Sequence, residues 1–132
     1  MCIRDRGKKV TASTTQGGNE PAKGNDGDVG SRWCAIDKTF PQWWRVDLGA
    51  LHELTQVSIQ FEHPERTYTY VIETSPNDAV YTQRAMVNGT GAVQSVDIPA
   101  GVTARYVRIT VTDGVPYGTT WASFFEFALY GY

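Results

Sequence analysis

Residues 43–49 read Trp-Trp-Arg-Val-Asp-Leu-Gly, and their side chains alternate between apolar and polar. In an extended chain, this alternation places Trp44, Val46 and Leu48 on one face and the charged side chains on the other. Residues 57–61, Val-Ser-Ile-Gln-Phe, repeat the period of two after a Gly-Ala break. We interpret the two runs as two strands that each bury one face.

Further short runs rich in β-branched and aromatic residues follow on the C-terminal side. They are residues 68–74, 80–87, 93–98, 105–112 and 123–130. Turn sequences such as Ser-Pro-Asn-Asp and Asn-Gly-Thr-Gly separate them, and no stretch keeps helical spacing over about ten positions. The sequence therefore predicts an all-β sandwich or barrel.

Composition limits the size and the partners of the protein. With 132 residues, 41% of them hydrophobic, the chain can bury one core, so we expect one domain. Its net charge of −2 gives no general attraction to nucleic acid or to an anionic membrane. No run of about eighteen apolar residues predicts a membrane-spanning helix.

The first residues differ in character from the rest. Residues 1–6, Met-Cys-Ile-Arg-Asp-Arg, lack the apolar stretch of a signal peptide and resemble an adapter-derived scar found at the start of metagenomic translations. We expect a non-native leader there and a single domain over residues 7–132. Residues 7–31 are rich in Gly, Asn, Asp, Lys and Thr, which favours an irregular loop. Cys34 is expected to be a buried free thiol, since Cys2 lies in the leader.

Several ordered pieces resemble a known family. They are Asn25-Asp26-Gly27-Asp28, Ser31-Arg32-Trp33, residues 43–49, residues 70–75 (Tyr-Val-Ile-Glu-Thr-Ser), residues 104–109 (Ala-Arg-Tyr-Val-Arg-Ile) and residues 126–131 (Glu-Phe-Ala-Leu-Tyr-Gly). Together they resemble the discoidin family, the coagulation factor 5/8 type C domains, and most of all its family 32 carbohydrate-binding modules. The resemblance covers nearly everything after residue 7. It implies a galactose-binding-like fold, a single jelly-roll β-sandwich of about seven to eight mainly antiparallel strands.

One departure points to a branch of this family. Coagulation-type members join their termini by a disulfide, and no cysteine near Tyr132 could form one. The resemblance then implies a monomeric glycan-binding module in an extracellular or periplasmic protein, as a fragment of a larger secreted glycoside hydrolase or adhesin. Galactose-type or N-acetylated sugars are the ligands that it implies.

A calcium site is expected in the segment from Lys23 to Ser31. Ca²⁺ takes about six to eight oxygen ligands, which a loop rich in Asp, Gly and Ser can supply. The resemblance assigns a structural Ca²⁺ to the carbonyls of Lys23 and Asp28, the carboxylate of Asp26, and Ser31 and Glu126. In the alternative interpretation, both aspartates cap turns and Glu126 is a solvated strand residue.

Two loops are candidates for sugar binding. A sugar needs an aromatic face for its apolar side and polar partners for its hydroxyl groups. Glu62, His63 and Arg66 follow one strand as a compact set of donors and acceptors, and Tyr117 and Trp121 lie among Gly and Pro in a later loop. Trp121 is the preferred stacking residue. Alternatively, His63 is a solvated side chain and Trp121 covers the core.

The remaining aromatic and basic residues are expected to be structural. We assign Trp33, Trp43 and Trp44 to the core or its edge, and we expect Arg32, Arg105 and Arg108 to pair with carboxylates such as Asp47. We assign no catalytic residues. Neither histidine belongs to a nucleophile motif, and a small sandwich offers no enclosed cleft for a carboxylate pair. A protein- or phospholipid-binding adhesion domain is the alternative. The mixed-charge loop at residues 62–66 makes membrane binding the weaker alternative.

Overall fold

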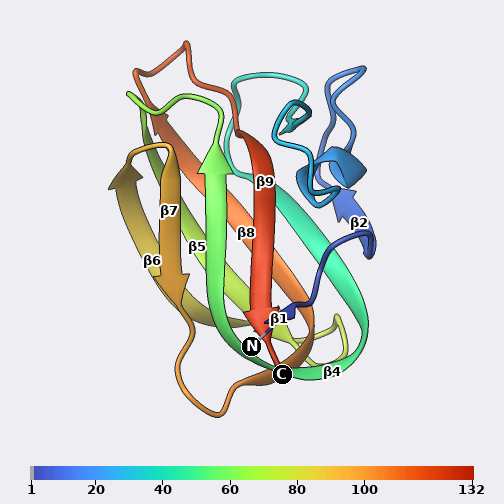
Figure 1. Cartoon of the computed structure of the whole chain (residues 1–132). Helices are drawn as coiled ribbons and strands as arrows, with labels where there is room; N and C mark the ends of the chain where they lie inside the picture. Colours follow the sequence, from blue (N-terminus) through green and yellow to red (C-terminus); the bar gives the residue numbers. More distant parts are fainter. Residues whose placement is uncertain (1) are drawn as a thin grey trace.

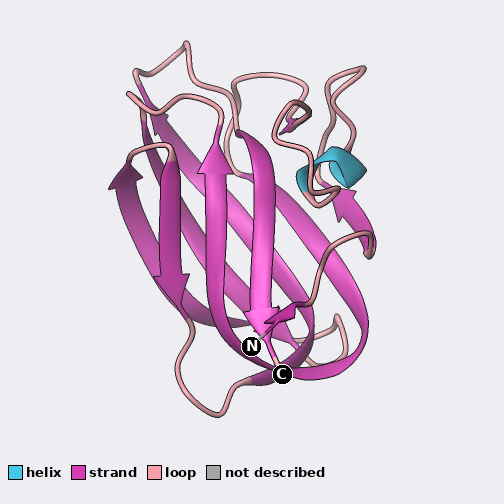
Figure 2. Cartoon of the chain, viewed as in Figure 1, coloured by secondary structure: helices cyan, strands magenta, loops and turns pink. Residues whose placement is uncertain are grey.

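The computed structural model describes residues 2–132, and strands make up nearly all of its regular structure (Figure 2). The strands are β1 (Cys2–Ile3), β2 (Lys9–Ala12), β3 (Trp33–Cys34), β4 (Gln42–Phe61), β5 (Thr67–Ser75), β6 (Thr82–Thr90), β7 (Val93–Asp97), β8 (Thr103–Val115) and β9 (Ser123–Gly131), with one 3₁₀ turn, η1 (Pro21–Gly24). Each strand pairing in residues 2–132 is antiparallel. The predicted all-β jelly-roll sandwich is confirmed. No helix among these residues has the length and apolar character needed to cross a bilayer.

The two layers of the sandwich share strand β4 (Figure 1). Residues 42–53 of β4 pair with β2 and β8, and β5 and β6 extend this sheet. Residues 54–61 pair with β9 and β7, and β9 also pairs with β1 and β3. The β4 strand therefore passes from one sheet to the other.

The sequence-based division of this segment into two strands is wrong. The Gly-Ala break lies inside β4, where the register shifts between Asp47 and His52 and Gly49 adopts a φ of 81°. Glycine enters this left-handed region without a steric penalty, so the chain bends there and stays extended on both sides.

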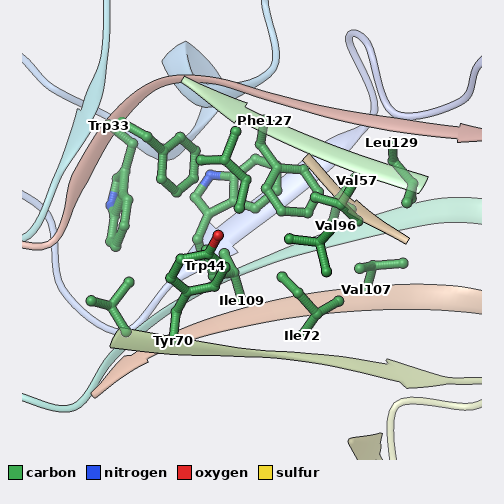
Figure 3. Packing of buried hydrophobic residues seen from close by; sticks show 14 of the residues in the cluster. Trp33, Trp44, Val57, Tyr70, Ile72, Val96, Val107, Ile109, Phe127 and Leu129 are labelled. Carbon is green, nitrogen blue, oxygen red and sulfur yellow. The ribbon is translucent and has the colours of Figure 1, made fainter. Parts of the chain in front are cut away.

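Aromatic side chains fill the space between the sheets (Figure 3). Trp33 and Trp44 have no exposed surface, and Trp44 packs against Phe124 and Phe127 with ring centroids 5.4 and 4.9 Å apart. Trp43 is half-buried on the opposite face of β4. The assignment to the core is confirmed for Trp33 and Trp44. It is wrong for Trp43, because the alternation along β4 turns this ring to the outer face, where the Arg45 guanidinium lies 5.5 Å from its centroid.

Residues 2–6 are part of the sandwich. Cys2 and Ile3 pair with the end of β9, and the fully buried Asp5 accepts a hydrogen bond from the Leu129 N–H at 3.0 Å. Setting these residues apart from the fold was therefore wrong for residues 2–6, because they extend the edge of a sheet. Met1, the first residue of the expected leader, lies outside the described residues. A non-native origin of residues 1–6 stays a prediction.

The long N-terminal segment is more ordered than its composition indicated. Residues 7–31 contain β2 and η1, and the buried Asn25 side chain donates to the carbonyls of Asp5 and Lys8 at 2.7 and 3.0 Å. Cys34 is a buried free thiol, as expected, and Cys2 is an exposed one. Burial raises the pKa of the Cys34 thiol to about 11, so the thiol stays protonated at neutral pH.

The connections that follow β3, β4 and β8 gather at one end of the sandwich (Figure 1). The two termini lie at the other end, where Cys2 is paired with Gly131. The loops that carry the predicted sugar-binding residues, after β4 and after β8, therefore lie side by side.

Candidate functional site

A pocket of about 260 Å³ opens among these loops. Its lining consists of Gln16, Arg32, Cys34, Glu62, His63, Arg66, Thr119 and Trp121. Four of the five predicted sugar-binding residues are therefore together in one concavity. The pocket is close in size to the smaller ligand sites of proteins, and charged groups stand in it beside an aromatic ring.

Glu62 is fixed at the pocket by two neighbouring elements. Its Oε1 accepts a hydrogen bond from the Ser123 hydroxyl at 2.8 Å, and its Oε2 lies 3.3 Å from the Arg32 Nε. Ser123 begins β9 and Arg32 precedes β3, so this carboxylate ties three parts of the chain together. It is both a pocket residue and a structural one.

His63 stands between two carboxylates. Its Nε2 lies 3.7 Å from Glu62 Oε1, and its Nδ1 lies 3.7 Å from Glu65 Oε1. The ring lines the pocket and about a third of the side chain is exposed. His63 is therefore not a freely solvated side chain, which was the alternative interpretation.

Arg66 joins the two predicted loops. Its Nη1 donates to the Thr119 carbonyl at 2.5 Å, and its Nε lies 3.7 Å from the exposed Glu65 carboxylate. The guanidinium thus holds the loop after β8 against the loop after β4, and Arg66 is also one of the residues that line the pocket.

Trp121 provides the aromatic surface of the pocket. The side chain is half-buried, and its indole N–H is buried without a hydrogen-bond partner. The Lys38 ammonium lies 5.0 Å from the centroid of the ring, at a cation–π distance. Because the N–H is enclosed, Trp121 offers a ligand its ring surface.

Tyr117 is the predicted residue that the structure does not bring to the pocket. It lies on the same loop as Trp121, but its side chain is 72% exposed and does not line the cavity. A contact of Tyr117 with a longer ligand stays a prediction.

Sequence reasoning missed four of the lining residues. Gln16 and Thr119 gave no signal, because only the tertiary fold brings them beside Trp121. Arg32 pairs with a carboxylate, as expected, but that carboxylate is Glu62 and the pair lines the pocket. Arg32 and Cys34 alternate with the buried Trp33 and Ala35. In an extended segment this alternation predicts that Arg32 and Cys34 point away from the core, and it was the one sequence pattern that could have indicated their place in the pocket.

The proposed calcium ligands lie close to one another. Ser31 Oγ donates to Asp26 Oδ2 at 2.7 Å and contacts the Asp28 carbonyl at 3.2 Å. The Glu126 carboxylate accepts from the Gly27 N–H at 3.2 and 3.3 Å. Burial, and then the negative charges of Asp26 and Asp28, raise the pKa of Glu126 to about 7.

The oxygen chemistry of this cluster fits a hard cation. Within residues 2–132, no three His, Cys, Asp or Glu side chains converge as a ligand group, so hydroxyl and carbonyl oxygens would have to complete the shell. The two aspartates also accept from the N–H groups of Asp28 and Gly30, two residues after each. This is the turn-capping role of the alternative interpretation, whereas Glu126 is half-buried instead of solvated. The carbonyl of Lys23 lies at the end of η1.

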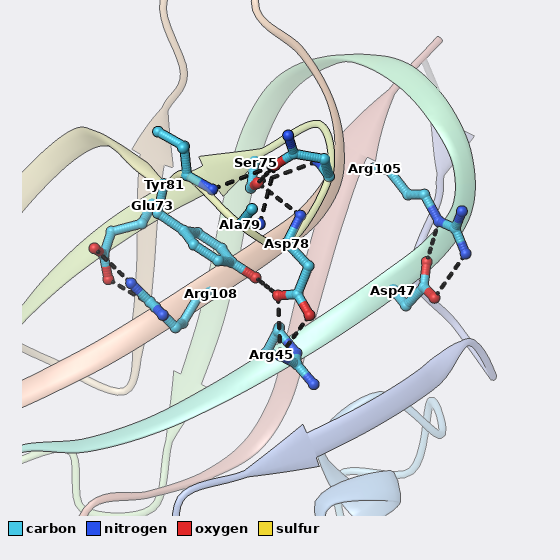
Figure 4. Close-up of polar contacts among 11 residues, drawn as sticks. Arg45, Asp47, Glu73, Ser75, Asp78, Ala79, Tyr81, Arg105 and Arg108 are labelled. Atoms are coloured by element: carbon cyan, nitrogen blue, oxygen red, sulfur yellow. Dashed lines mark hydrogen bonds and ion pairs between the residues drawn. The ribbon is translucent and has the colours of Figure 1, made fainter.

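A second polar cluster covers the outer face of the sheet that contains β8 (Figure 4). Arg105 pairs with Asp47 at 2.8 Å and Arg108 with Glu73 at 3.0 Å, which confirms the expected carboxylate partners. Asp78 accepts from Arg45 at 2.9 Å and from the Tyr81 hydroxyl. These charges satisfy one another, so the cluster stabilises the sheet face.

A β-sandwich with this pocket at its loop end defines the class of galactose-binding-like domains. The F5/8 type C domain model matches residues 9–127. The chain belongs to the F5/8 type C domain family. No curated protein matches the chain.

Solved structures of carbohydrate-binding modules share this fold. Chitosan-binding module 1 from the chitosanase/glucanase of Paenibacillus sp. IK-5 is 28% identical, with a TM-score of 0.87 over 99% of this chain and 100% of that one. The CBM32 of AlyQ, in complex with 4,5-unsaturated mannuronic acid, is 30% identical, with a TM-score of 0.84 over 98% of both chains. The family 32 module of C. perfringens NanJ, in complex with galactose, is 21% identical, with a TM-score of 0.80 over 92% and 91%, and this last likeness concerns the fold alone.

Proposed function

We propose that this chain is a non-catalytic carbohydrate-binding module that holds a sugar in the pocket between the loops after β4 and β8. The observation that carries the proposal is the half-buried ring of Trp121 beside the charged groups of Glu62, His63 and Arg66 in one cavity. An aromatic surface can pack against the apolar face of a pyranose ring, while charged groups take its hydroxyl oxygens. The binding of chitosan and of mannuronic acid by similar modules supports it.

The number of carboxylates in the pocket also supports a binding role. A glycosidase needs two carboxyl groups across the bond that it cleaves, one of them protonated. Of the residues that line the pocket, Glu62 is the single carboxylate, and Arg32 and Ser123 hold both of its oxygens. The lining therefore lacks the second carboxyl group that such a reaction requires.

The proposal also includes a bound calcium ion, a location outside the cytoplasm and a larger parent protein. A structural Ca²⁺ held by Asp26, Ser31, Glu126 and nearby carbonyls would tie residues 23–31 to β9. As modules of this kind belong to carbohydrate-active enzymes, we place the protein outside the cell or in the periplasm, as a monomeric unit of a larger enzyme or adhesin. Galactose-type or N-acetylated sugars are the first ligands to test.

A glycan array tests the proposal with the whole chain and Ca²⁺ present. An open pocket on a small domain should bind a single sugar weakly, at high micromolar to millimolar Kd, or about −4 to −5 kcal/mol. Multivalent display on the array makes such binding detectable. Selective binding to one group of glycans supports the module, whereas a blank array from folded protein contradicts it and favours an adhesion domain for protein or phospholipid.

A further inference from the structure

The pocket is positively charged on a chain that is negatively charged. Its lining contains Arg32 and Arg66 against the single carboxylate of Glu62, while the whole chain has a net charge of −2. Two charges beside the lining cancel in number: Lys38 lies 5.0 Å from the centroid of the Trp121 ring, and Glu65 lies 3.7 Å from Arg66 Nε. The local excess of one positive charge is therefore a property of this cavity and not of the surface in general.

The oxygen acceptors that line the pocket already face protein donors. Glu62 Oε1 accepts from the Ser123 hydroxyl at 2.8 Å, and its Oε2 lies 3.3 Å from Arg32 Nε in an ion pair that has no hydrogen-bond geometry. The Thr119 carbonyl accepts from Arg66, and the side-chain oxygen of Gln16 accepts from the Asn19 amide at 2.6 Å. A ligand group that must donate a proton therefore meets oxygens that already have protein partners, and the His63 imidazole is the remaining acceptor among these side chains.

The donors, by contrast, are only partly used. A guanidinium has several N–H groups. Arg66 uses its Nη1 for Thr119 and directs its Nε toward Glu65. Arg32 forms an ion pair with Glu62 at 3.3 Å, and its Nε is buried without a hydrogen-bond partner. The side-chain oxygen of Gln16 accepts a hydrogen bond from Asn19, so the NH₂ group of Gln16 is the part of the amide that can bind a ligand. The cavity therefore offers a ligand mainly N–H groups.

From this asymmetry we infer that the pocket selects an anionic sugar, one that carries a carboxylate or a sulfate, and that Arg32 and Arg66 bind the acidic group. The inference rests on the proposed function and names its ligand class. A carboxylate or sulfate only accepts hydrogen bonds and matches paired guanidinium groups. The hydroxyls of a neutral sugar must also donate, and the ammonium of a glucosamine unit would face two arginines. Similar modules bind both kinds of glycan, chitosan in one and mannuronic acid in another, and the donor excess favours the second.

Calorimetric titration of the whole chain with four oligosaccharides tests the inference. The probes are an oligouronate, a sulfated galacto-oligosaccharide, a neutral galacto-oligosaccharide and chitotriose. We expect at least one acidic probe to bind about tenfold more tightly than the neutral and cationic ones. Its affinity should fall severalfold between about 0.05 and 0.5 M NaCl, because salt screens a partly exposed charge pair. The acidic probe with the lower Kd shows whether the pocket prefers a carboxylate or a sulfate.

Variants then identify the arginines. Arg32→Gln and Arg66→Gln should each weaken acidic-sugar binding about tenfold, the loss of one charge-assisted hydrogen bond. Arg66→Lys keeps the charge and reports whether the link to Thr119 matters. Arg105→Gln is the matched control, since it removes the same charge from a partly exposed ion pair with Asp47 on the outer sheet face, away from the pocket. It should leave the affinity unchanged.

The outcomes separate the inference from the proposed function. Equal or tighter binding of the neutral probe or of chitotriose, lost in Trp121→Ala, overturns the acidic class and keeps the sugar pocket. Acidic binding that Arg105→Gln weakens as much as Arg66→Gln does also overturns the inference, because the attraction is then non-specific. Failure of all four probes, or binding that Trp121→Ala leaves intact, counts against the proposed function itself.

Discussion

At the scale of single residues, the pocket depends on side chains that have a structural role and, in our proposal, a binding role as well. Glu62 and Arg66 each make contacts that hold loops in place, so their substitution changes both the wall of the pocket and its chemistry. Trp121 differs, because its enclosed N–H has no partner to lose. It is the residue whose removal reports most directly on ligand contact.

Trp121→Ala is expected to abolish detectable sugar binding while the domain stays folded, since the ring lies at the loop end and the main core is formed elsewhere. Calorimetric titration measures the binding, and far-ultraviolet circular dichroism measures the fold. Tyr117→Ala is the matched control for a monosaccharide, because that ring is 72% exposed on the same loop and outside the pocket lining; it should bind the monosaccharide normally, since its predicted contact is with a longer ligand. Normal binding by Trp121→Ala would show that the stacking assignment is wrong.

At the scale of strands and loops, the elements with a sustained period of two were predictable and the shorter ones were not. The runs at residues 68–74 and 105–112 lie inside β5 and β8, because each has enough alternating positions to show its buried face. β2 and β3 span only Lys9–Ala12 and Trp33–Cys34, which is too short for a pattern. Their position depends on pairing with β4 and β9, a tertiary effect that local sequence does not contain.

Some residues of the candidate site could be predicted from the sequence and others could not. Glu62, His63 and Arg66 were predictable because one loop carries them all and its polar groups exceed what a turn needs. Gln16 and Thr119 are distant in the chain and reach the cavity only through the packing of the long N-terminal segment and the loop after β8. Residue spacing could not place them beside Trp121.

Calcium is expected to stabilise the contact between residues 23–31 and β9. At Ca²⁺ about a hundredfold above its Kd, the free energy of unfolding should rise by about 2–3 kcal/mol relative to protein in EDTA. The gain should be larger at pH 8 than at pH 5.5, because the pKa of Glu126 is about 7 without the ion and the carboxylate must lose its proton to bind. Differential scanning calorimetry measures both effects.

Asp26→Asn and Glu126→Gln should remove the calcium response. Asp37→Asn is the control, because Asp37 also caps a turn, through Thr39 at 3.0 Å, but lies in the loop before β4. An Asp26→Asn protein that responds to Ca²⁺ as the wild type does would show that the ion binds elsewhere or not at all.

At the scale of the whole molecule, the stability of the sandwich should depend on a carboxyl group buried between the N-terminal segment and β9. Burial raises the pKa of Asp5 to about 7, against the opposing hydrogen bond from the Leu129 N–H. Its Oδ2 is buried without a partner. The folded state therefore binds this proton more tightly than the unfolded chain does.

The protonated Asp5 contributes fully to the free energy of unfolding below the pKa of the unfolded chain, which is about 4. This contribution is lost as the pH rises toward the folded-state pKa of about 7. Asp5→Asn is neutral at every pH and should gain about 2–4 kcal/mol relative to the wild type between pH 4 and pH 8. Urea denaturation of both proteins at the two pH values measures the difference. Parallel pH profiles would mean that Asp5 is ionised in the folded state.

The pairing of Cys2 with Gly131 places the two ends of the chain side by side, at the end of the sandwich away from the pocket. A polypeptide attached at either end would leave the sugar-facing loops uncovered. Because the ends are adjacent, the domain could also be spliced into a surface loop of a host protein without separating the two sides of that loop. Its place in a multidomain architecture is therefore not restricted to a terminus.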